Sequence, residues 1–567
     1  MAKSKSGDRR LAVVAIVLVL GLAVVAGKLA LLQGIQAEHY KELASDQRDT
    51  HIQITPRRGT VFDREGEILA ISEDVTTVYA TPYQIKNPEA AAKGIAEVLG
   101  EDPEDVQDKL DSNSGFVYLA RKLDKTLANR IKEMDIEGVG FVDESKRFYP
   151  MGEFASQVLG VVDIDNKGQA GLELYYEDTL GGKPGEVLLE RDAVGNPIPG
   201  SEKRRVQAVD GVDLQLTIDK DIQACVEESL RGAVDRHGAR AGTAVVLDCN
   251  TGDILAMATS PGFDPNDRAM VEPEAMRNRA VTDVYEPGSV LKVVTAVGAL
   301  EEGVVEPNSV IQVPSQLQVA DEVFTDAEPT AGRALEFKKV ISQSSNVGTI
   351  QVALMLGNSR LSDYLDRFGL GHRTGIDFPG EVGGLVPAVS DWSGTSIATI
   401  SIGQGISITP LQLACLAGAV ANGGRRICPH FLKAKITEKG VEDMGLGGLG
   451  EEILSGETCQ EMTGIMEQVV APGGTGTRAA VSFYRVAGKT GTAAKARENA
   501  AGYTKRYMAT FVGFAPAERP RVVVLVVLDE PSPIWGGHTS APVFKEIMGY
   551  SLQHLNIPPS LGPSPHG

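Results

Sequence analysis

The pattern of apolar and polar residues changes abruptly near the start of the chain. Residues 11–27 form an uninterrupted uncharged run, and the apolar stretch continues to residue 32 with only Lys28 inside it. A helix of about 20 apolar residues is long enough to cross a bilayer. We therefore expect a single transmembrane anchor over 11–32, followed by chain with the patterning of a water-soluble fold.

The residues before this run are basic. Four Lys or Arg residues and one acid stand among the first ten. Because basic flanks remain in the cytoplasm, we expect 1–10 to be a cytoplasmic tail and the folded part to lie on the other side of the membrane. A cleaved signal peptide is the alternative, with Val-Val-Ala before Gly27 as a passable cleavage site. The run exceeds the 7–15 residues usual in signal peptides, which favours a retained anchor.

Residues 36–205 mix strand and helix patterns. "PRRGTVFDREGEILA" at 56–70 has apolar residues on both sides of a turn-forming stretch, which predicts a β-hairpin. Two short helices are predicted at 87–110, and 152–185 is expected to mix strands, glycine turns and one amphipathic helix. We expect a mixed α+β domain that ends in a charged connector, 200–205.

A second folded unit is expected over 208–553. Two strands are predicted at 242–259 and two more at 509–531, with a largely helical region between them. Within that region Thr409 and Gly423 read as the N-cap and C-cap of one helix. Strands at both ends imply one antiparallel sheet flanked by helices, so the fold class is α+β.

Composition narrows the possible functions. A chain of 567 residues exceeds a single core. Its net charge of -20 argues against nucleic-acid binding and is typical of an acidic soluble surface. The five cysteines lack Cys-x-x-Cys spacing and the eight histidines are scattered, so we expect no metal and no cofactor. An odd cysteine count leaves at least one thiol unpaired. The Pro/Ser-rich end, 556–567, is expected to be disordered.

The stretch "YEPGSVLKVVTAVGAL" at 285–300 carries the first candidate chemistry. It places Ser289 at the predicted N-cap of a helix and Lys292 one turn later on the same face. A serine hydroxyl needs a base, and lysine serves only when its pKa falls from about 10.4 toward 7, a cost of roughly 4–5 kcal/mol. Free N–H groups at a helix start would favour an oxyanion. Alone, however, Ser-x-x-Lys is expected about once by chance, and an ordinary capped helix is the alternative.

Two further motifs follow in order. Ser-x-Asn occurs once, as Ser344-Ser345-Asn346, and "VAGKTGTAAK" contains Lys489-Thr490-Gly491-Thr492 in a predicted edge strand. A second Lys-Ser-Gly, at 5–7, falls in the predicted tail and is accidental. The ordered trio is the one found in penicillin-binding proteins and class A β-lactamases.

Each residue of the lysine-containing strand has an expected role. Lys489 supplies the second cation that would lower the pKa of Lys292, and it can anchor an anionic substrate terminus. Thr490 and Thr492 offer hydroxyls to a carboxylate. Gly491 would let the substrate lie against the strand backbone.

The remaining roles concern the proton and the oxyanion. Ser344 can pass a proton between Lys292 and a leaving amine, while Asn346 can hydrogen-bond a peptide carbonyl or a lysine. The backbone N–H groups of Ser289 and Thr492 are the expected oxyanion hole.

From the anchor to about residue 550 the chain resembles the class B penicillin-binding proteins, which are bacterial peptidoglycan D,D-transpeptidases. The resemblance is carried by the trio and by "RRGTVFDREGEILA", "GQAGLELYYEDTLGGKPG", "PGFDPN", "NRAVTDVYEPGSVLK", "GQGISITPLQLA" and "FVGFAPAERP". It implies a pedestal domain of the penicillin-binding protein dimerisation type, then a transpeptidase domain of the β-lactamase-like fold. Arg58, Gly59, Asp63 and Arg64 match the family's pedestal motif, which is structural.

The resemblance also implies a reaction. Ser289 would attack the D-Ala-D-Ala bond of a peptidoglycan stem peptide, release the terminal D-Ala and pass the acyl group to an amine of a neighbouring stem peptide. β-Lactams would acylate the same serine. The enzyme would be single-pass in the bacterial inner (cytoplasmic) membrane, with a periplasmic or extracellular catalytic domain.

Within the class the chain looks most like the division-specific, septal member, with the elongation-specific member as the alternative. Because no glycosyltransferase domain is present, a polytopic membrane glycosyltransferase and divisome proteins are the implied partners. A β-lactamase or D,D-carboxypeptidase would pass the acyl group to water, and a non-catalytic scaffold or β-lactam sensor would keep only the fold. The two hydrolases do not need a pedestal behind a retained anchor. A scaffold or sensor has little reason to keep both lysines and Ser344.

Two further stretches are expected to be structural. "PGGTGTRA" at 472–479 resembles a phosphate-binding loop but lacks the Gly-Lys-Ser/Thr ending, so a turn near the cleft is expected. Asp63 and Arg64 could act as a catalytic pair, but a salt bridge within the hairpin is the simpler expectation.

Overall fold

The structure, a computed structural model, describes residues 5–41, 49–112, 114–190, 203–267, 271–328, 332–445, 447–497 and 502–560. The contacts of the chain divide it into two units. The first comprises 1–56 with 182–210, and the second 57–181 with 211–567. The second unit thus holds most of the expected pedestal domain together with nearly all of the 208–553 segment.

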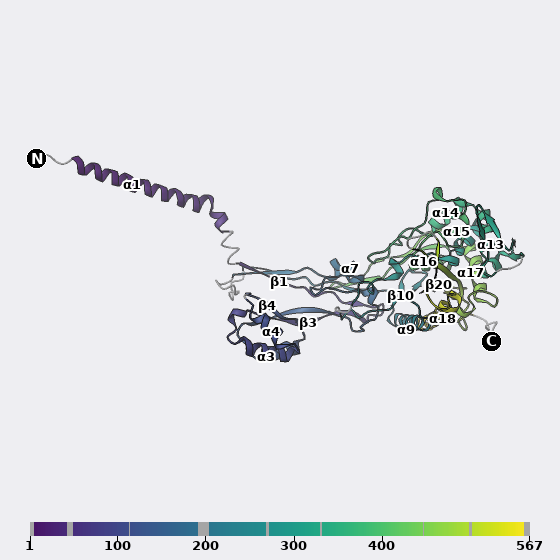
Figure 1. Ribbon diagram of the computed structural model, residues 1–567, viewed down its shortest axis with the longest axis horizontal. Helices are drawn as coiled ribbons and strands as arrows, with labels where there is room; N and C mark the ends of the chain where they lie inside the picture. The colour runs from purple at the N-terminus through teal and green to yellow at the C-terminus, as the bar shows by residue number, and fades with distance from the viewer. Residues whose placement is uncertain are drawn as a thin grey trace. The chain divides into compact units, whose positions relative to one another are not determined.

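The first unit begins with a long apolar helix. Helix α1 spans Lys5–Ala30 and continues into a π-helical turn, Leu31–Ile35 (Figure 1). Its apolar side chains are exposed. By length and composition, Arg9–Ile35 can cross a membrane, as predicted for 11–32. A three-stranded antiparallel sheet completes the unit, in the order β1 (Asp49–Ile54), β6 (Gly185–Glu190), β7 (Arg204–Val206). The first part of the predicted connector, 200–202, lies outside the described residues.

A seven-stranded sheet joins distant parts of the second unit. Its strands run in the order β17-β16-β8-β2-β3-β4, with β5 also paired to β3. Their bounds are Val61–Phe62 (β2), Ile68–Ala80 (β3), Val117–Leu123 (β4), Val139–Phe148 (β5), Asp213–Leu216 (β8), Leu432–Thr437 (β16) and Gly440–Asp443 (β17). The antiparallel β2–β3 pair is the predicted hairpin, with a bulge in its register. Because β8 pairs with both β2 and β16, one sheet connects the pedestal to the segment around residue 435.

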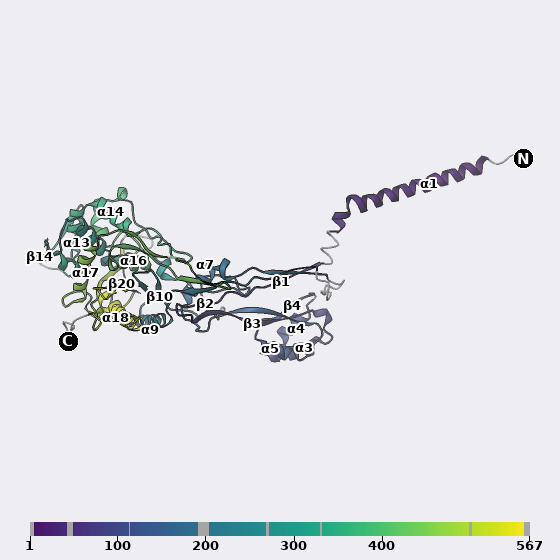
Figure 2. The ribbon, with the colours of Figure 1, turned by 180° about the vertical axis from the view of Figure 1, so that it is seen from behind.

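Three helices cover the outer strands of this sheet. Helices α3 (Pro88–Leu99) and α4 (Pro103–Leu110) are the two predicted at 87–110, and α5 (Lys125–Lys132) follows them (Figure 2). The side chains of Asn87 and Asp102 cap α3 and α4, and each helix has proline at its first position. Their apolar faces share one core cluster with β3 and β4. Local capping and amphipathic spacing therefore explain why this prediction is confirmed.

The prediction of one amphipathic helix at 152–185 is wrong. Three short helices occur instead: α6 (Ser156–Leu159), α7 (Gly171–Tyr175) and α8 (Glu177–Leu180). Gly160 ends the first of them with φ +84°, and a Cβ there would lie 1.9 Å from the carbonyl oxygen of Ala170. The chain must fold back on itself at that point, so no continuous helix can form.

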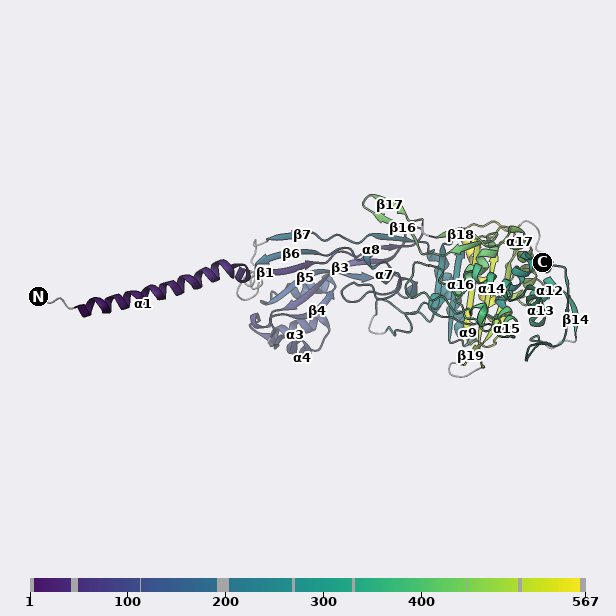
Figure 3. The same ribbon diagram turned by 90° about the horizontal axis from the view of Figure 1, so that it is seen from above.

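The segment after the pedestal is built on a five-stranded antiparallel sheet in the order β10-β9-β21-β20-β19. Its strands are β9 (Ala241–Asp248), β10 (Ile254–Ser260), β19 (Ala487–Ala496), β20 (Tyr503–Ala515) and β21 (Val522–Asp529) (Figure 3). Helices α9 (Lys220–His237) and α18 (Gly536–His554) pack with one face of the sheet, and α16 (Pro410–Ala421) packs with the other. The prediction of one sheet built from both ends of this segment is confirmed, and β19 is its edge strand.

Other local predictions meet mixed outcomes. Thr409 caps α16 as predicted, in a capping box with Gln412, but the C-cap is Asn422, one residue before Gly423. All five cysteines are free thiols. The chain end expected to be disordered, 556–567, begins with residues that pack, since Ile557 is buried and accepts a hydrogen bond from Tyr484; residues 561–567 lie outside the described part.

The predicted salt bridge between Asp63 and Arg64 is wrong. The Asp63 side chain is buried and accepts the backbone N–H groups of Glu65 and Glu67 at 2.9 and 2.8 Å. Arg64 instead lies near Glu65, with 3.6 Å between Nε and Oε1. A buried carboxylate in a tight turn is best satisfied by the turn's own N–H groups.

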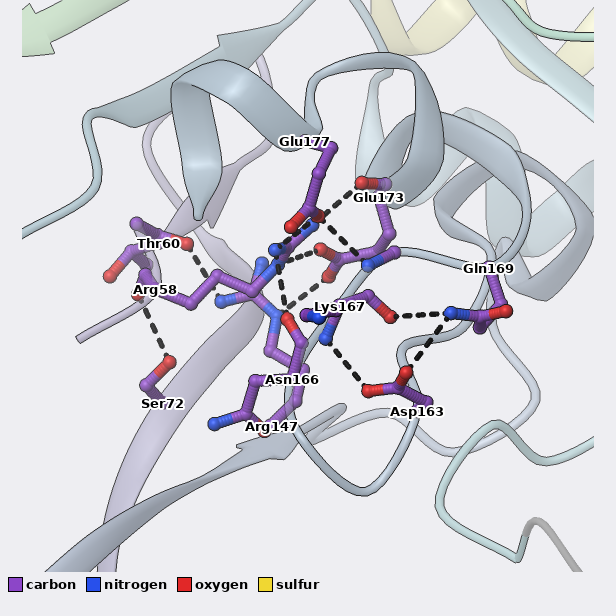
Figure 4. Close-up of polar contacts among 12 residues, drawn as sticks. Arg58, Thr60, Ser72, Arg147, Asp163, Asn166, Lys167, Gln169, Glu173 and Glu177 are labelled. Carbon is purple, nitrogen blue, oxygen red and sulfur yellow. Dashed lines mark hydrogen bonds and ion pairs between the residues drawn. The ribbon is translucent and has the colours of Figure 1, made fainter. Parts of the chain in front are cut away.

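Arg58 of the pedestal motif enters a buried ionic cluster that the sequence did not indicate. Its Nε donates to Glu173 Oε2 at 2.5 Å, and Arg147 Nε donates to the other carboxylate oxygen at 2.6 Å (Figure 4). Arg58 Nη1 also reaches Glu177 Oε2 at 2.7 Å. Burial by itself would raise the pKa of Glu173, but the charges of Arg147 and Arg58 outweigh it and hold that pKa below its usual value. The cluster ties β5 and the α7–α8 segment to the start of the pedestal hairpin.

Candidate active site

The candidate nucleophile lies in a tight turn, not at a helix cap. A 3-10 turn, Gly288–Val290, precedes helix α11, which spans Lys292–Glu301. The prediction of Ser289 as N-cap is therefore wrong, because Gly288 (φ +53°) bends the chain before the helix can start. Among the described residues the Ser289 hydroxyl has no hydrogen-bond partner, which leaves it available to a substrate.

Gly491 of the edge strand brings that strand against the nucleophile turn. A Cβ on Gly491 would lie 2.9 Å from Val290 Cγ2 and 3.1 Å from the carbonyl oxygen of Pro287. The sequence suggested that glycine here admits the substrate backbone. The structure supplies a different reason, which is close packing of β19 on the turn that carries Ser289.

Two buried lysines converge on Ser344. Lys292 and Lys489 are both fully buried. The Ser344 hydroxyl lies 3.2 Å from Lys292 Nζ and 3.0 Å from Lys489 Nζ. Lys292 Nζ also donates to the carbonyl oxygen of Ser344 at 2.6 Å and to Asn346 Oδ1 at 2.7 Å. Residues from three distant motifs thus meet within hydrogen-bonding distance.

The electrostatics of this cluster lower the pKa of both lysines. Burial lowers the pKa of Lys292 well below its usual value, the charge of Lys489 lowers it further, and Asp326 partly opposes both. Burial also lowers the pKa of Lys489 to about 7. A neutral amine has two N–H donors and one lone pair. Because the two shortest contacts of Lys292 take both donors, its lone pair is left for a hydroxyl proton.

Asp326 organises the Ser-Ser-Asn turn, and no sequence motif indicated it. It accepts hydrogen bonds from the Ser345 hydroxyl at 2.9 Å and from the Val347 N–H at 3.0 Å. Ser345 in turn caps helix α13, which spans Asn346–Leu356. Ser344 adopts φ +58°, a conformation that non-glycine residues rarely take and that is common at functional sites. The surrounding contacts hold it there.

The threonines of β19 are held from two sides. Thr490 Oγ1 lies 2.8 Å from Thr475 Oγ1, and Thr492 Oγ1 accepts the Gly536 N–H at 3.2 Å where α18 begins. The segment 472–479 is a turn beside this strand, and Gly473 to Thr475 line the cleft. The prediction of a turn near the cleft is therefore confirmed.

These elements enclose a cleft of about 600 Å³. The predicted residues that line it are Ser289, Ser344, Asn346, Thr490 and Thr492. Lining residues that the sequence did not single out are Asp326, Glu328, Arg333, Trp535 and His538. Lys292 and Lys489 do not line the cleft themselves, but both are hydrogen-bonded to Ser344, which does. The pedestal residues do not line the cleft; these are Arg58, Gly59, Asp63 and Arg64. Within the described ranges no group of three or more His, Cys, Asp or Glu side chains is placed to hold a metal.

Comparison with known proteins agrees with this arrangement. Residues 242–549 match the family described as penicillin binding protein transpeptidase domain, and residues 53–216 match the penicillin-binding protein dimerisation domain. All three motifs of the cleft lie within the first match.

Full-length relatives are similar over both domains. The chain is 37% identical to penicillin-binding protein PbpB of Mycolicibacterium smegmatis, covering 96% of this chain and 90% of that protein. It is 35% identical to peptidoglycan D,D-transpeptidase FtsI of Escherichia coli, covering 96% and 91%. The crystal structure of penicillin binding protein 3 from Mycobacterium tuberculosis complexed with aztreonam superposes with a TM-score of 0.72 at 30% identity, covering 90% and 98%. The chain therefore belongs to the class B penicillin-binding proteins, the family of peptidoglycan D,D-transpeptidases.

Proposed function

We propose that Ser289 is the acyl-accepting nucleophile of this transpeptidase and that Lys292, Ser344 and Lys489 serve it. One observation carries the proposal: two fully buried lysines share the hydroxyl of Ser344, in the same cleft that Ser289 lines. A buried amine with a depressed pKa is a competent base near neutral pH, which an exposed lysine is not.

Acylation begins when the lone pair of Lys292 takes the Ser289 Oγ proton and Oγ attacks the carbonyl carbon of the penultimate D-Ala. The backbone N–H groups of Ser289 and Thr492 hold the resulting oxyanion. As the C–N bond breaks, Lys292 returns the proton through the Ser344 hydroxyl to the nitrogen of the leaving D-Ala. The products are an ester on Ser289 and free D-Ala.

Transfer repeats these steps in reverse with another amine. An amine of a neighbouring stem peptide attacks the ester carbonyl, its proton passes to Lys292, and Ser289 Oγ leaves as the new amide forms. The substrate's terminal carboxylate is held by the hydroxyls of Thr490 and Thr492 and by the charge of Lys489 in its protonated form. Asn346 binds a peptide carbonyl or orients Lys292. A β-lactam, whose strained amide and carboxylate resemble this terminus, acylates the same serine.

The rate of acylation is expected to be bell-shaped with pH. Lys292 acts as a neutral base, so the rate falls on the acid side as Lys292 becomes protonated. Lys489 binds the carboxylate as a cation and has a pKa of about 7, so the rate falls as the pH rises through that value. Measuring the second-order rate constant for penicillin acylation from pH 5 to 10 checks this, since it reports the free enzyme. A rate that keeps rising above pH 8 would contradict the role of Lys489.

We further propose a septal role, with the N-terminal helix retained as an anchor and the catalytic domain outside the cytoplasm. Near-full-length similarity to FtsI and PbpB and the basic residues before the apolar run at 11–32 support this. A fluorescent fusion that replaces the native protein in dividing cells is expected to gather at midcell. Uniform labelling of the side wall would favour the elongation-specific alternative.

A further inference from the structure

One cation of the cleft has no role in the chemistry described above. Arg333 lines the cleft, half-buried, and makes no side-chain hydrogen bond or ion pair within the described part of the chain. Its Nε is shielded from solvent and has no partner. A shielded donor without a partner is uncommon in native proteins, and a ligand that accepts a hydrogen bond from Arg333 would satisfy it.

The backbone places Arg333 on a fixed element. It is the first residue of strand β14 (Arg333–Glu336), which pairs with β11 (Val310–Val313) in antiparallel register. Strand β14 leads directly into helix α12 (Phe337–Ser342), which ends just before Ser344. Arg333 therefore lies on the chain segment that leads into the Ser-Ser-Asn turn, and not on strand β19, which is proposed to bind the terminal carboxylate.

Neighbouring acids do not neutralise it. Asp326 also lines the cleft, but its carboxylate already accepts from the Ser345 hydroxyl and from the Val347 N–H. Glu328 is exposed and forms no ion pair with Arg333. A planar guanidinium of this kind is suited to a carboxylate, which it can bind with two parallel hydrogen bonds.

We propose that Arg333 binds a second carboxylate of the donor stem peptide, separate from the terminal one held by β19. The inference rests on the proposed function, because that function places the scissile bond at Ser289. A stem peptide can carry such a carboxylate in two places: on the side chain of a diaminopimelate at the third position, or on the α-carbon of a γ-linked glutamyl residue at the second. Arg333 would therefore make the enzyme prefer substrates that bear this charge.

The test uses soluble D-Ala-D-Ala pentapeptides with the full chain in detergent. Three substrates separate the sources: one with diaminopimelate and an amidated glutamyl residue, one with lysine and a free glutamyl α-carboxylate, and one with lysine and an amidated glutamyl residue. Release of D-Ala gives kcat and KM for wild type and for Arg333→Gln. A control variant, Arg373→Gln, removes an exposed arginine outside the cleft.

The wild type is expected to prefer one carboxylate-bearing peptide over the uncharged one by about five- to tenfold in kcat/KM, through KM. Arg333→Gln is expected to abolish that preference. Its kcat, its kcat/KM for the uncharged peptide and its rate of acylation by penicillin should all equal those of the wild type. Whichever carboxylate-bearing peptide is preferred identifies the source. Arg373→Gln should behave as wild type, and the preference should shrink with added salt.

Equal use of all three peptides by the wild type would overturn the inference, as would an equal loss for all three in Arg333→Gln. The penicillin reaction separates this outcome from failure of the function itself. If wild-type protein is not acylated by penicillin at Ser289, the proposed function falls, and the inference falls with it.

Discussion

Replacing Ser289 with alanine is expected to abolish covalent labelling by a fluorescent penicillin, with a loss of about 10⁴-fold or more in the acylation rate. Ser289 lines the cleft, and its hydroxyl has no hydrogen-bond partner among the described residues. Because that hydroxyl makes no bond within the described part of the chain, its removal should change the free energy of unfolding by less than about 0.5 kcal/mol. Gel fluorescence and a thermal melt check both statements.

A companion variant separates the base from the nucleophile. Lys292→Met keeps an apolar chain of similar length in the buried position, so labelling should nearly vanish although Ser289 remains. Lys545→Met changes an exposed lysine on α18 and should label like wild type. A stable adduct on the Ser289→Ala protein would show that another residue is the nucleophile. Rapid loss of the wild-type adduct would favour a hydrolase over a transpeptidase.

Replacing Glu173 with glutamine is expected to have the largest effect on stability, lowering the free energy of unfolding by about 3 kcal/mol or more. Arg58 and Arg147 would each lose the buried carboxylate that they share, and both guanidinium groups are themselves buried. The measurement is urea unfolding of the wild type and the variant at pH 7, followed by a probe in the pedestal.

The matched control is Glu177→Gln. Glu177 also contacts Arg58, but 36% of its side chain is exposed, so the loss should stay within about 1 kcal/mol. The pH dependence has a definite sign. Because the folded-state pKa of Glu173 is depressed, the advantage of wild type over Glu173→Gln is present above about pH 4.3 and shrinks as the pH falls below it. A Glu173→Gln protein as stable as wild type would mean that the cluster contributes no net stability.

Much of the fold was predictable because its signals are local. Helices α3, α4 and α16 have capping side chains and proline at their first position, and these act over a few residues. Where glycines bring the chain against itself, local reasoning failed, as at Gly160 and Gly288. Glycine is required at those positions by close contact with segments that are distant in sequence.

The candidate site divides in the same way. The motifs reveal the chemical types without any structure: a serine, two lysines, a second serine, an asparagine and a threonine-flanked glycine, in three ordered motifs. The sequence did not indicate that Asp326 and Arg333 line the cleft, or that Glu173 joins the pedestal cluster. An isolated acid or arginine has no sequence spacing that reveals its partner. That Lys292 and Lys489 share the hydroxyl of Ser344 becomes evident from the folded chain alone. The pKa of a lysine depends on burial and on nearby charge, and both arise only when distant segments pack together.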